Sequence, residues 1–285
     1  MALGHEVKLI PPAHVKPYVR RNKTDAVDAA AICEAAMRPG QRFVVLRSID
    51  NQAAVMRHRV REQLVGQRTA LLNALRGHLS EIGVVAAQGA QHAYRLKRML
   101  ADGADENGEI VIPERVRVAL APLAAQIDAL EQAIAAIDDK LIETVKADEK
   151  ARRLMTIPGV GPVIATAVVA TVGEAASFAS GREFAAFLGL TPRQRSSGGK
   201  ERLGRITKMG DRYLRKLLVV GATTVLHHAI GHNDSLRRWA RQMLERKGGR
   251  AGFKLAAVAL ANKLARIVFA ILRSGEVYDD RPVVA

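Results

Sequence analysis

Apolar residues recur every three or four positions along two long stretches of the chain. From Ser48 to Ile82 no proline interrupts this pattern, and polar residues fill the positions between. From Pro113 to Lys150 the apolar positions run from Leu123 to Val145. Because this period places apolar side chains on one helical face, we expect two long, coiled-coil-like helices or the arms of an antiparallel hairpin.

Shorter helical patterns occupy much of the remaining chain. An Ala-rich run follows Thr24, a candidate N-cap, and ends before Pro39-Gly40. Glu6 to Ile10 has a strand pattern with no second clear strand nearby, and a single strand needs sheet partners from elsewhere. The fold class predicted is therefore mainly α. The other expected helices cover Pro162 to Val172, Gly181 to Leu188, Gly210 to Ala229 and Ala251 to Ser274.

These patterns divide the chain into three parts. We expect a short N-terminal part over residues 1–47, the long helices over 48–150 and a helical domain over 151–285. The main boundary lies where the second long helix gives way to "RRLMTIPGVGP".

Composition favours a nucleic-acid partner. The chain holds 44 Lys and Arg against 28 Asp and Glu, a net charge of +16, and its 48% of hydrophobic residues argues against wholesale disorder. The densest basic segment, residues 191–218, contains Arg193, Arg195, Lys200, Arg202, Arg205, Lys208, Arg212, Arg215 and Lys216. A second basic cluster lies in "RRWARQMLERKGGRAGFK", so we expect the two clusters to bind a polyanion and not to form a merely solvated surface.

Membrane and secreted classes are disfavoured. Leu154 to Gly173 is free of charge for a spanning length, but its prolines and glycines favour a buried turn and helix. The N-terminus lacks a signal-peptide pattern, and Cys33, the single cysteine, excludes an internal disulfide. We expect a cytoplasmic protein with no membrane partner.

Three short motifs have both a structural and a functional reading. In "IPGVGP", Gly159 and Gly161 form a helix–hairpin–helix-like turn that either contacts phosphate or only joins two packed helices. Asp25 and Asp28 share a helical face, where they either bind a divalent ion or favour the helix dipole, and the residues alone favour the second reading. In "RQRSSGGKER", the serines are either an ordinary loop or the group that attacks a bound polyanion.

Several long motifs together resemble the transposases of the insertion-sequence-110 family, whose relatives include pilin-gene inverting recombinases. "KLIPPAHVKPYVRRNKTDAVDAAAI" is similar to the end of that family's RuvC-like (ribonuclease H-like) domain. "LMTIPGVGPVIATAVVATVG", "FAAFLGLTPRQRSSGGKERLGRITKMGDRYLRKLLVVGA" and "AAVALANKLARIVFAIL" resemble its C-terminal transposase domain. The resemblance implies a remnant of the α/β RuvC-like domain, long coiled-coil-like helices and a helical transposase domain.

The same resemblance implies a mechanism. Ser197, directly before a glycine, matches the family's proposed nucleophile toward a DNA phosphate, with Ser196 as the fallback. Asp25 and Asp28 match the last two acids of a four-carboxylate metal site, for which Mg²⁺ is expected. The family also implies DNA and a structured guide RNA as partners. A homo-oligomer, dimer or tetramer, is expected because the apolar seam from Leu123 to Val145 is only partly covered by the other long helix.

One departure from the family pattern lowers the expected activity. The family's first aspartate and its glutamate lie on strands that would precede this sequence, so half of the metal site is missing. We therefore expect an N-terminally truncated transposase that is catalytically inactive. The alternatives are a non-catalytic nucleic-acid-binding protein derived from a degenerate copy and a metal nuclease that does not use the serine.

Overall fold

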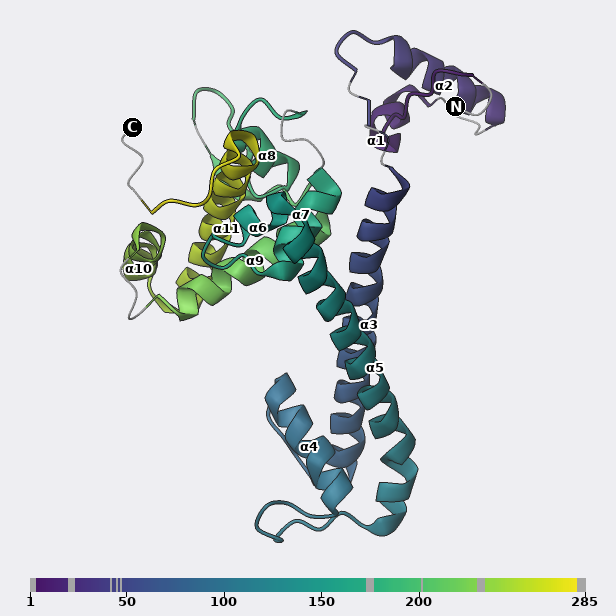
Figure 1. Cartoon of the computed structure of the whole chain (residues 1–285), viewed down its shortest axis with the longest axis vertical. Coiled ribbons are helices and arrows are strands. Elements are labelled where there is room, and N and C mark those ends of the chain that lie inside the picture. The colour runs from purple at the N-terminus through teal and green to yellow at the C-terminus, as the bar shows by residue number, and fades with distance from the viewer. Residues whose placement is uncertain are drawn as a thin grey trace. The chain divides into compact units, whose positions relative to one another are not determined.

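The computed structural model describes residues 4–19, 24–41, 43–44, 46, 48–172, 177–200, 202–229 and 234–280. The chain divides into two compact units, residues 1–52 and residues 53–285 (Figure 1). The boundaries predicted near residues 47 and 150 stay predictions.

The first unit is built around α2, Asp25–Met37. Thr24 caps this helix, because its hydroxyl accepts a hydrogen bond of 3.3 Å from the Val27 N–H. Two short turns precede it, α1 (Pro12–Val15) and the 3-10 helix η1 (Lys16–Tyr18).

The strand expected over Glu6–Ile10 is wrong for the described residues of this unit. Only Leu9 pairs there, in an isolated antiparallel bridge with Val44. Pro11 and Pro12 follow at once and cannot donate to a ladder, so the pairing does not extend. The α/β character implied by the resemblance therefore has no sheet in the part of this unit that the structure describes.

The second unit contains both long helices. α3 covers Ile49–Glu81, beginning in the first unit, and α5 covers Glu114–Ala147, each within three residues of the predicted ends. A further helix that the apolar pattern did not predict, α4 (Ala90–Asp102), packs against α5. Residues of α3, α4 and α5 share one core, which includes the fully buried Leu75 and Leu79 of α3 and Ile127 of α5.

The seam of α5 is partly covered within the chain. Ile127, Ile134, Leu141 and Val145 are buried, and α5 packs against α4, α6 and α7. The seam residues Leu123, Leu130 and Ile137 are only half-buried. Self-association through this seam, as a dimer or tetramer, therefore stays a prediction.

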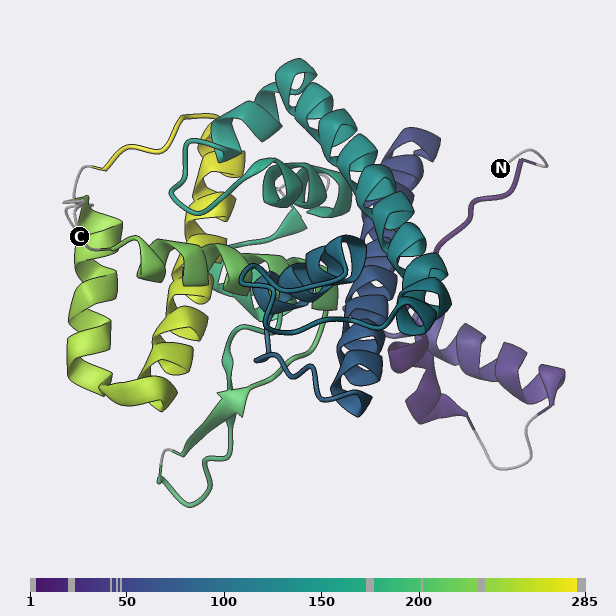
Figure 2. The same cartoon turned by 90° about the horizontal axis from the view of Figure 1, so that it is seen from below.

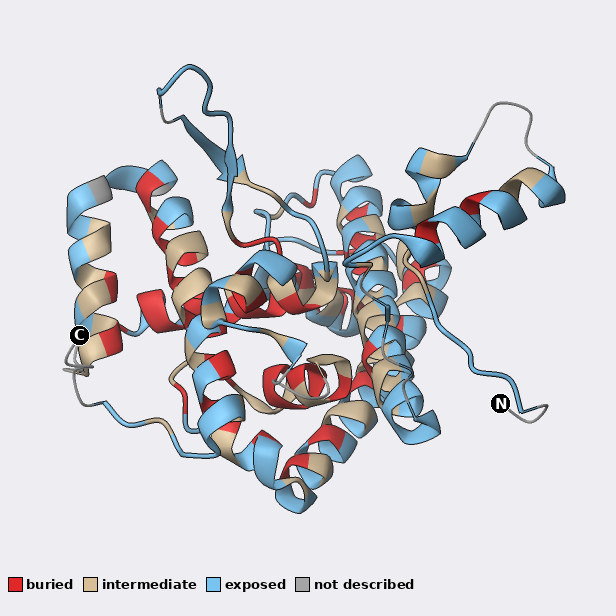
Figure 3. Ribbon diagram, turned by 90° about the horizontal axis from the view of Figure 1, so that it is seen from above, coloured by how far each residue is buried: buried red, intermediate tan, exposed pale blue. Residues whose placement is uncertain are grey.

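The C-terminal part is a helical cluster with one small hairpin. Its helices are α6 (Glu149–Leu154), α7 (Pro162–Val172), α8 (Gly181–Phe187), α9 (Arg212–His227), α10 (Ser235–Lys247) and α11 (Gly249–Ser274). Apolar faces of these helices meet in one core, with α11 packing on α8, α9 and α10 (Figure 3). Four of the helices start at a capping side chain: Asp148, Ser180, Asp211 and Asp234.

Among the residues that the structure describes, two helices are long and apolar enough to cross a membrane. They are α5 and residues Ala251–Ser274 of α11. Core helices of soluble proteins pass the same test; half of the apolar window of α11 is buried in this unit, against 17% of that of α5. The absence of a membrane partner stays a prediction.

The turn before α7 contacts α9 at backbone distance. Gly159 has φ +83, and a Cβ added there would lie 2.5 Å from Cγ2 of Val225 and 2.7 Å from the carbonyl oxygen of Gly221. The tight turn is therefore required by helix packing. This contact accounts for Gly159 without a ligand.

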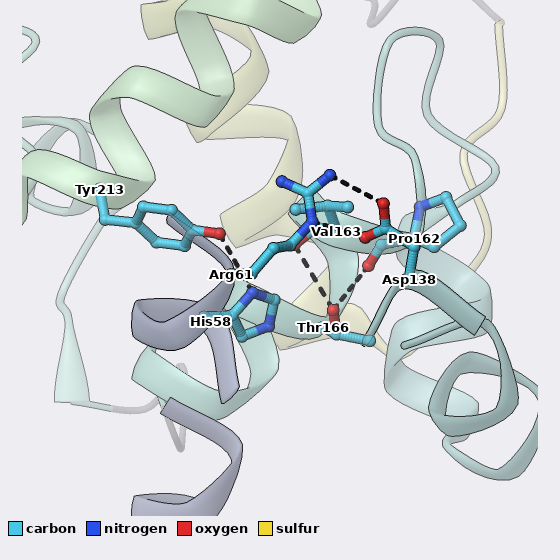
Figure 4. A network of polar contacts seen from close by, with 7 residues as sticks. All are labelled: His58, Arg61, Asp138, Pro162, Val163, Thr166 and Tyr213. Carbon is cyan, nitrogen blue, oxygen red and sulfur yellow. Dashed lines mark hydrogen bonds and ion pairs between the residues drawn. The ribbon is translucent and has the colours of Figure 1, made fainter. Parts of the chain in front are cut away.

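A polar network joins α3 to α5 and α9 (Figure 4). Arg61 donates to both carboxylate oxygens of Asp138, at 2.5 and 3.0 Å. His58 is 3% exposed, and its Nδ1 lies 3.2 Å from the hydroxyl of Tyr213. Burial, with Arg61 and Arg57 nearby, lowers the pKa of His58 to about 4, and burial raises the pKa of Tyr213 to about 12. Both side chains are therefore neutral near pH 7.

Replacing Gly159 should destabilise the second unit. We expect Gly159→Ala to lower the free energy of unfolding by about 2–4 kcal/mol, from a left-handed backbone and overpacking against α9. Gly161→Ala is the matched control, because a Cβ there meets nothing within 4 Å. Denaturant unfolding measures both, and equal losses in the two variants would contradict the packing role of Gly159.

Stability should depend on pH through His58. Its folded pKa lies below the ordinary value of 6.5, so the unfolded chain binds the proton more readily. The stabilisation is complete above pH 6.5 and is lost as pH falls toward 4, by at most about 3 kcal/mol. Unfolding curves of wild type and His58→Gln should converge across this window. His78→Gln, at an exposed position of the same helix, is the control. If the difference in unfolding free energy between wild type and His58→Gln stays constant across this pH window, His58 is not the source of the pH dependence.

Candidate nucleic-acid interface and active site

The segment that carries the two serines is a β-hairpin, which the sequence analysis missed. β1 (Pro192–Gln194) pairs antiparallel with β2 (Leu203–Ile206). The hairpin projects from the helical cluster in two views (Figure 2, Figure 3). The sequence signal was the Gly-Gly pair between two short runs, which is typical of a tight hairpin turn.

Gly198 and Gly199 form the tip of this hairpin. Their φ values are +57 and +75, which a two-residue type I′ turn requires at both central positions. The N–H of Lys200 donates to the carbonyl of Ser197 at 3.2 Å and closes the turn. A Cβ at either glycine would meet nothing within 4 Å, so the tip is open to a large ligand.

The two serines differ in what the fold requires of them. The hydroxyl of Ser196 accepts a hydrogen bond of 3.2 Å from the Arg202 N–H across the hairpin. The Ser197 side chain is exposed and has no hydrogen-bond partner among the described residues. Ser197 is therefore the hydroxyl that is free for chemistry, although no described group is placed to accept its proton.

Most of the predicted basic residues lie exposed on this hairpin or at the start of α9. The exposed ones are Arg193, Arg195, Lys200, Arg202, Arg205, Lys208, Arg212 and Lys216. Asp211, one of the two acids of the segment, caps α9 by accepting from the Leu214 N–H at 2.8 Å. Glu201, the other acid, lies outside the described residues.

Three of these basic side chains also have structural contacts. Arg215 is half-buried and donates to the carbonyls of Leu188 and Met209, at 2.9 and 3.0 Å. Arg193 donates to the carbonyl of Thr207 at 3.1 Å. Lys216 pairs with Glu62 of α3 at 3.2 Å. Arg215 therefore braces the base of the hairpin, and its contact with nucleic acid stays a prediction.

The predicted phosphate cradle at Gly159 and Gly161 lines a cleft of about 600 Å³. Its walls are mostly apolar residues of the turn, of α7 and of α9, and its one described cation is Arg61. Because Arg61 is already paired with Asp138, the cleft offers little positive charge to a phosphate. Phosphate contact at Gly159 and Gly161 stays a prediction.

The predicted metal ligands lie in the first unit, whereas the serines lie in the second. Asp25 is exposed and Asp28 half-exposed, both in the first turn of α2. No group of three or more His, Cys, Asp or Glu side chains is placed to hold an ion in the described parts of the chain. Two carboxylates there do not by themselves make a metal site.

Two family models match the chain. The model described as the transposase IS116/IS110/IS902 family matches residues 151–238, which include the hairpin and α9. A transposase model named for the DEDD proteins of IS110 matches residues 1–84, which include Asp25 and Asp28.

Curated relatives match almost the whole chain. A putative transposase, y4pF/y4sB, of Sinorhizobium fredii is 44% identical over 279 residues, covering 97% of this chain and 69% of that protein. A probable family 20 transposase of Pseudomonas aeruginosa is 43% identical over 95% of this chain and 78% of its own length. The transposase for insertion sequence element IS1111A of Coxiella burnetii is 40% identical over 98% of this chain and 74% of its own length. The chain therefore belongs to the IS110/IS116/IS902 family of transposases.

Proposed function

We propose that this transposase binds DNA through the exposed cations of the hairpin and α9, and that Ser197 attacks a DNA phosphate. The observation that carries the proposal is the position of Ser197, exposed at an open turn with basic side chains on both strands. Phosphate contacts from these cations would hold the strand, and the glycines let the backbone approach it closely.

The reaction is a transesterification at phosphorus. The Oγ of Ser197 forms a bond to phosphorus, the bond from phosphorus to one sugar oxygen breaks, and the serine becomes linked to one DNA end. The hydroxyl proton passes to solvent and the departing oxygen takes up a proton. Arg195 and Lys200 are the nearest candidates in sequence to offset the charge that develops on the phosphoryl oxygens.

A divalent metal is indicated by the matched DEDD model. Asp25 and Asp28 would contribute two carboxylates, and such an ion would offset phosphate charge during cleavage. The described residues supply no third ligand beside them. Mg²⁺ at this position, and inactivity toward ordinary DNA, therefore stay predictions.

The competing function is nucleic-acid binding without catalysis. It is favoured by the absence, among the described residues, of any group placed to accept the Ser197 proton. A guide RNA, an oligomer and a cytoplasmic location also stay predictions. The net charge of +16 is the support that this chain offers for a polyanionic partner beyond one duplex.

Duplex binding should depend steeply on salt. We expect log affinity to fall linearly with log salt, with a slope that reflects on the order of 5 to 10 phosphate contacts. Arg205→Gln with Arg212→Gln should reduce that slope by about 1.8, since each contact contributes about 0.9. Arg115→Gln with Lys146→Gln removes two exposed charges from α5 and is the control. Fluorescence anisotropy measures both, and a flat salt response would exclude the electrostatic interface.

Covalent capture should identify the serine. A DNA substrate whose leaving sugar oxygen is replaced by sulfur supplies a leaving group that needs no proton, so a weak nucleophile becomes detectable. We expect a protein–DNA adduct that Ser197→Ala abolishes and Ser196→Ala only reduces, with duplex binding unchanged in both. An adduct lost only in Ser196→Ala would identify Ser196 as the nucleophile in place of Ser197. No adduct in the wild type would support the competing function, nucleic-acid binding without catalysis. Ordinary DNA with Mg²⁺ should give no cleavage, which tests the predicted inactivity.

A further inference from the structure

A second pocket of the helical cluster is lined by residues at the start of α8 and by residues of α10 and α11. Its volume is about 960 Å³. Helices α10 and α11 lie side by side and are joined at Gly248 (Figure 2). Among the described residues that line the pocket there are three cations and no carboxylate: Arg182, Lys263 and Arg266.

These cations lack the partners that charged side chains usually have. Arg182 and Arg266 are exposed, whereas Lys263 is half-buried, and none of the three forms an ion pair within the described parts of the chain. Burial and the nearby Arg266 lower the pKa of Lys263. Holding like charges together with one of them half-buried is unfavourable unless an anion joins them.

An aromatic side chain completes the pocket. Trp239 of α10 lines it, and the Nζ of Lys263 lies 4.8 Å from the centroid of the indole ring. Ile267 and Phe269 of α11 add apolar surface, and Asn262 adds an amide. An anion-binding group beside an aromatic face is the combination that binds unpaired nucleotides, because every base has a face that can stack.

We propose that this pocket binds an unpaired nucleotide of a nucleic-acid strand, with its phosphate near Arg182, Lys263 and Arg266 and its base against Trp239. The inference rests on the proposed function and extends it to a second, single-stranded contact. A free phosphate would leave the apolar wall unused, and the bases of a duplex are already stacked and paired. The volume is within the range of small-ligand pockets, about 300–1,000 Å³.

Trp239 makes the pocket directly observable, because it is the only tryptophan in the sequence. The probes are oligothymidylate and oligouridylate of about 12 nucleotides, within the span of single-strand-binding modules, and a duplex of equal length. We expect both single strands to quench the tryptophan emission, and the duplex to bind, as measured by anisotropy of a dye on the DNA, with little quenching. Comparison of the two single strands separates DNA from RNA as the source of the nucleotide.

A charge-matched pair of variants tests the phosphate contacts. Arg182→Gln with Arg266→Gln should lower the salt slope of single-strand binding by about 1.4, since each phosphate contact contributes about 0.7. Arg115→Gln with Lys146→Gln removes two exposed charges from α5, outside the pocket and outside both basic clusters, and should leave the slope unchanged. All four side chains are exposed, so circular dichroism and thermal melts should show folded proteins.

The outcomes separate this inference from the proposed function. Single-strand binding without quenching, equal slopes in the two double variants, or equal quenching by the duplex would overturn the nucleotide pocket while leaving DNA binding intact. Absence of any anisotropy change at low salt, with single strands and duplex alike, would refute the pocket and the DNA-binding function together.

Discussion

The backbone contact between Gly159 and α9 is the constraint on which the site depends. It fixes α9 against the turn that begins α7, because no side chain at residue 159 could fit between them. From the start of α9, Arg215 reaches back to the carbonyls of Leu188 and Met209, on either side of the hairpin. The base of the hairpin is thereby held by a packed core. Its tip, which carries Ser197, is left open.

Two kinds of charged site matter in this unit. Arg61, half-buried on α3, is paired with Asp138, and His58 is neutral because burial disfavours its charged form. Cations without an ion pair among the described residues lie on the hairpin and around Trp239, where a ligand can reach them. A net charge of +16 therefore need not oppose folding strongly, since the excess stays in contact with water or with a polyanion.

Helices were more predictable from this sequence than the site was. The ends of α3, α5 and α7 were predicted within three residues, because a long apolar period reports burial directly. The helices α4 and α10 were missed because many charged and polar residues interrupt their apolar faces. The partial burial of the α5 seam and the pairing of His58 with Tyr213 depend on residues far apart in the chain, and no local pattern encodes such contacts.

The structure also separates residues that the fold already uses from residues that it leaves free. Gly159, Ser196 and Arg215 belong to motifs that read as functional, yet each has a packing or hydrogen-bonding role that explains its identity. Ser197 and Arg212 have no such role among the described contacts, and both are exposed. A hydroxyl or cation that contributes nothing to stability can be positioned for a ligand at no cost to the fold. For this reason the chemistry of the chain is better sought at Ser197 than at Ser196, although the two are neighbours with the same functional group.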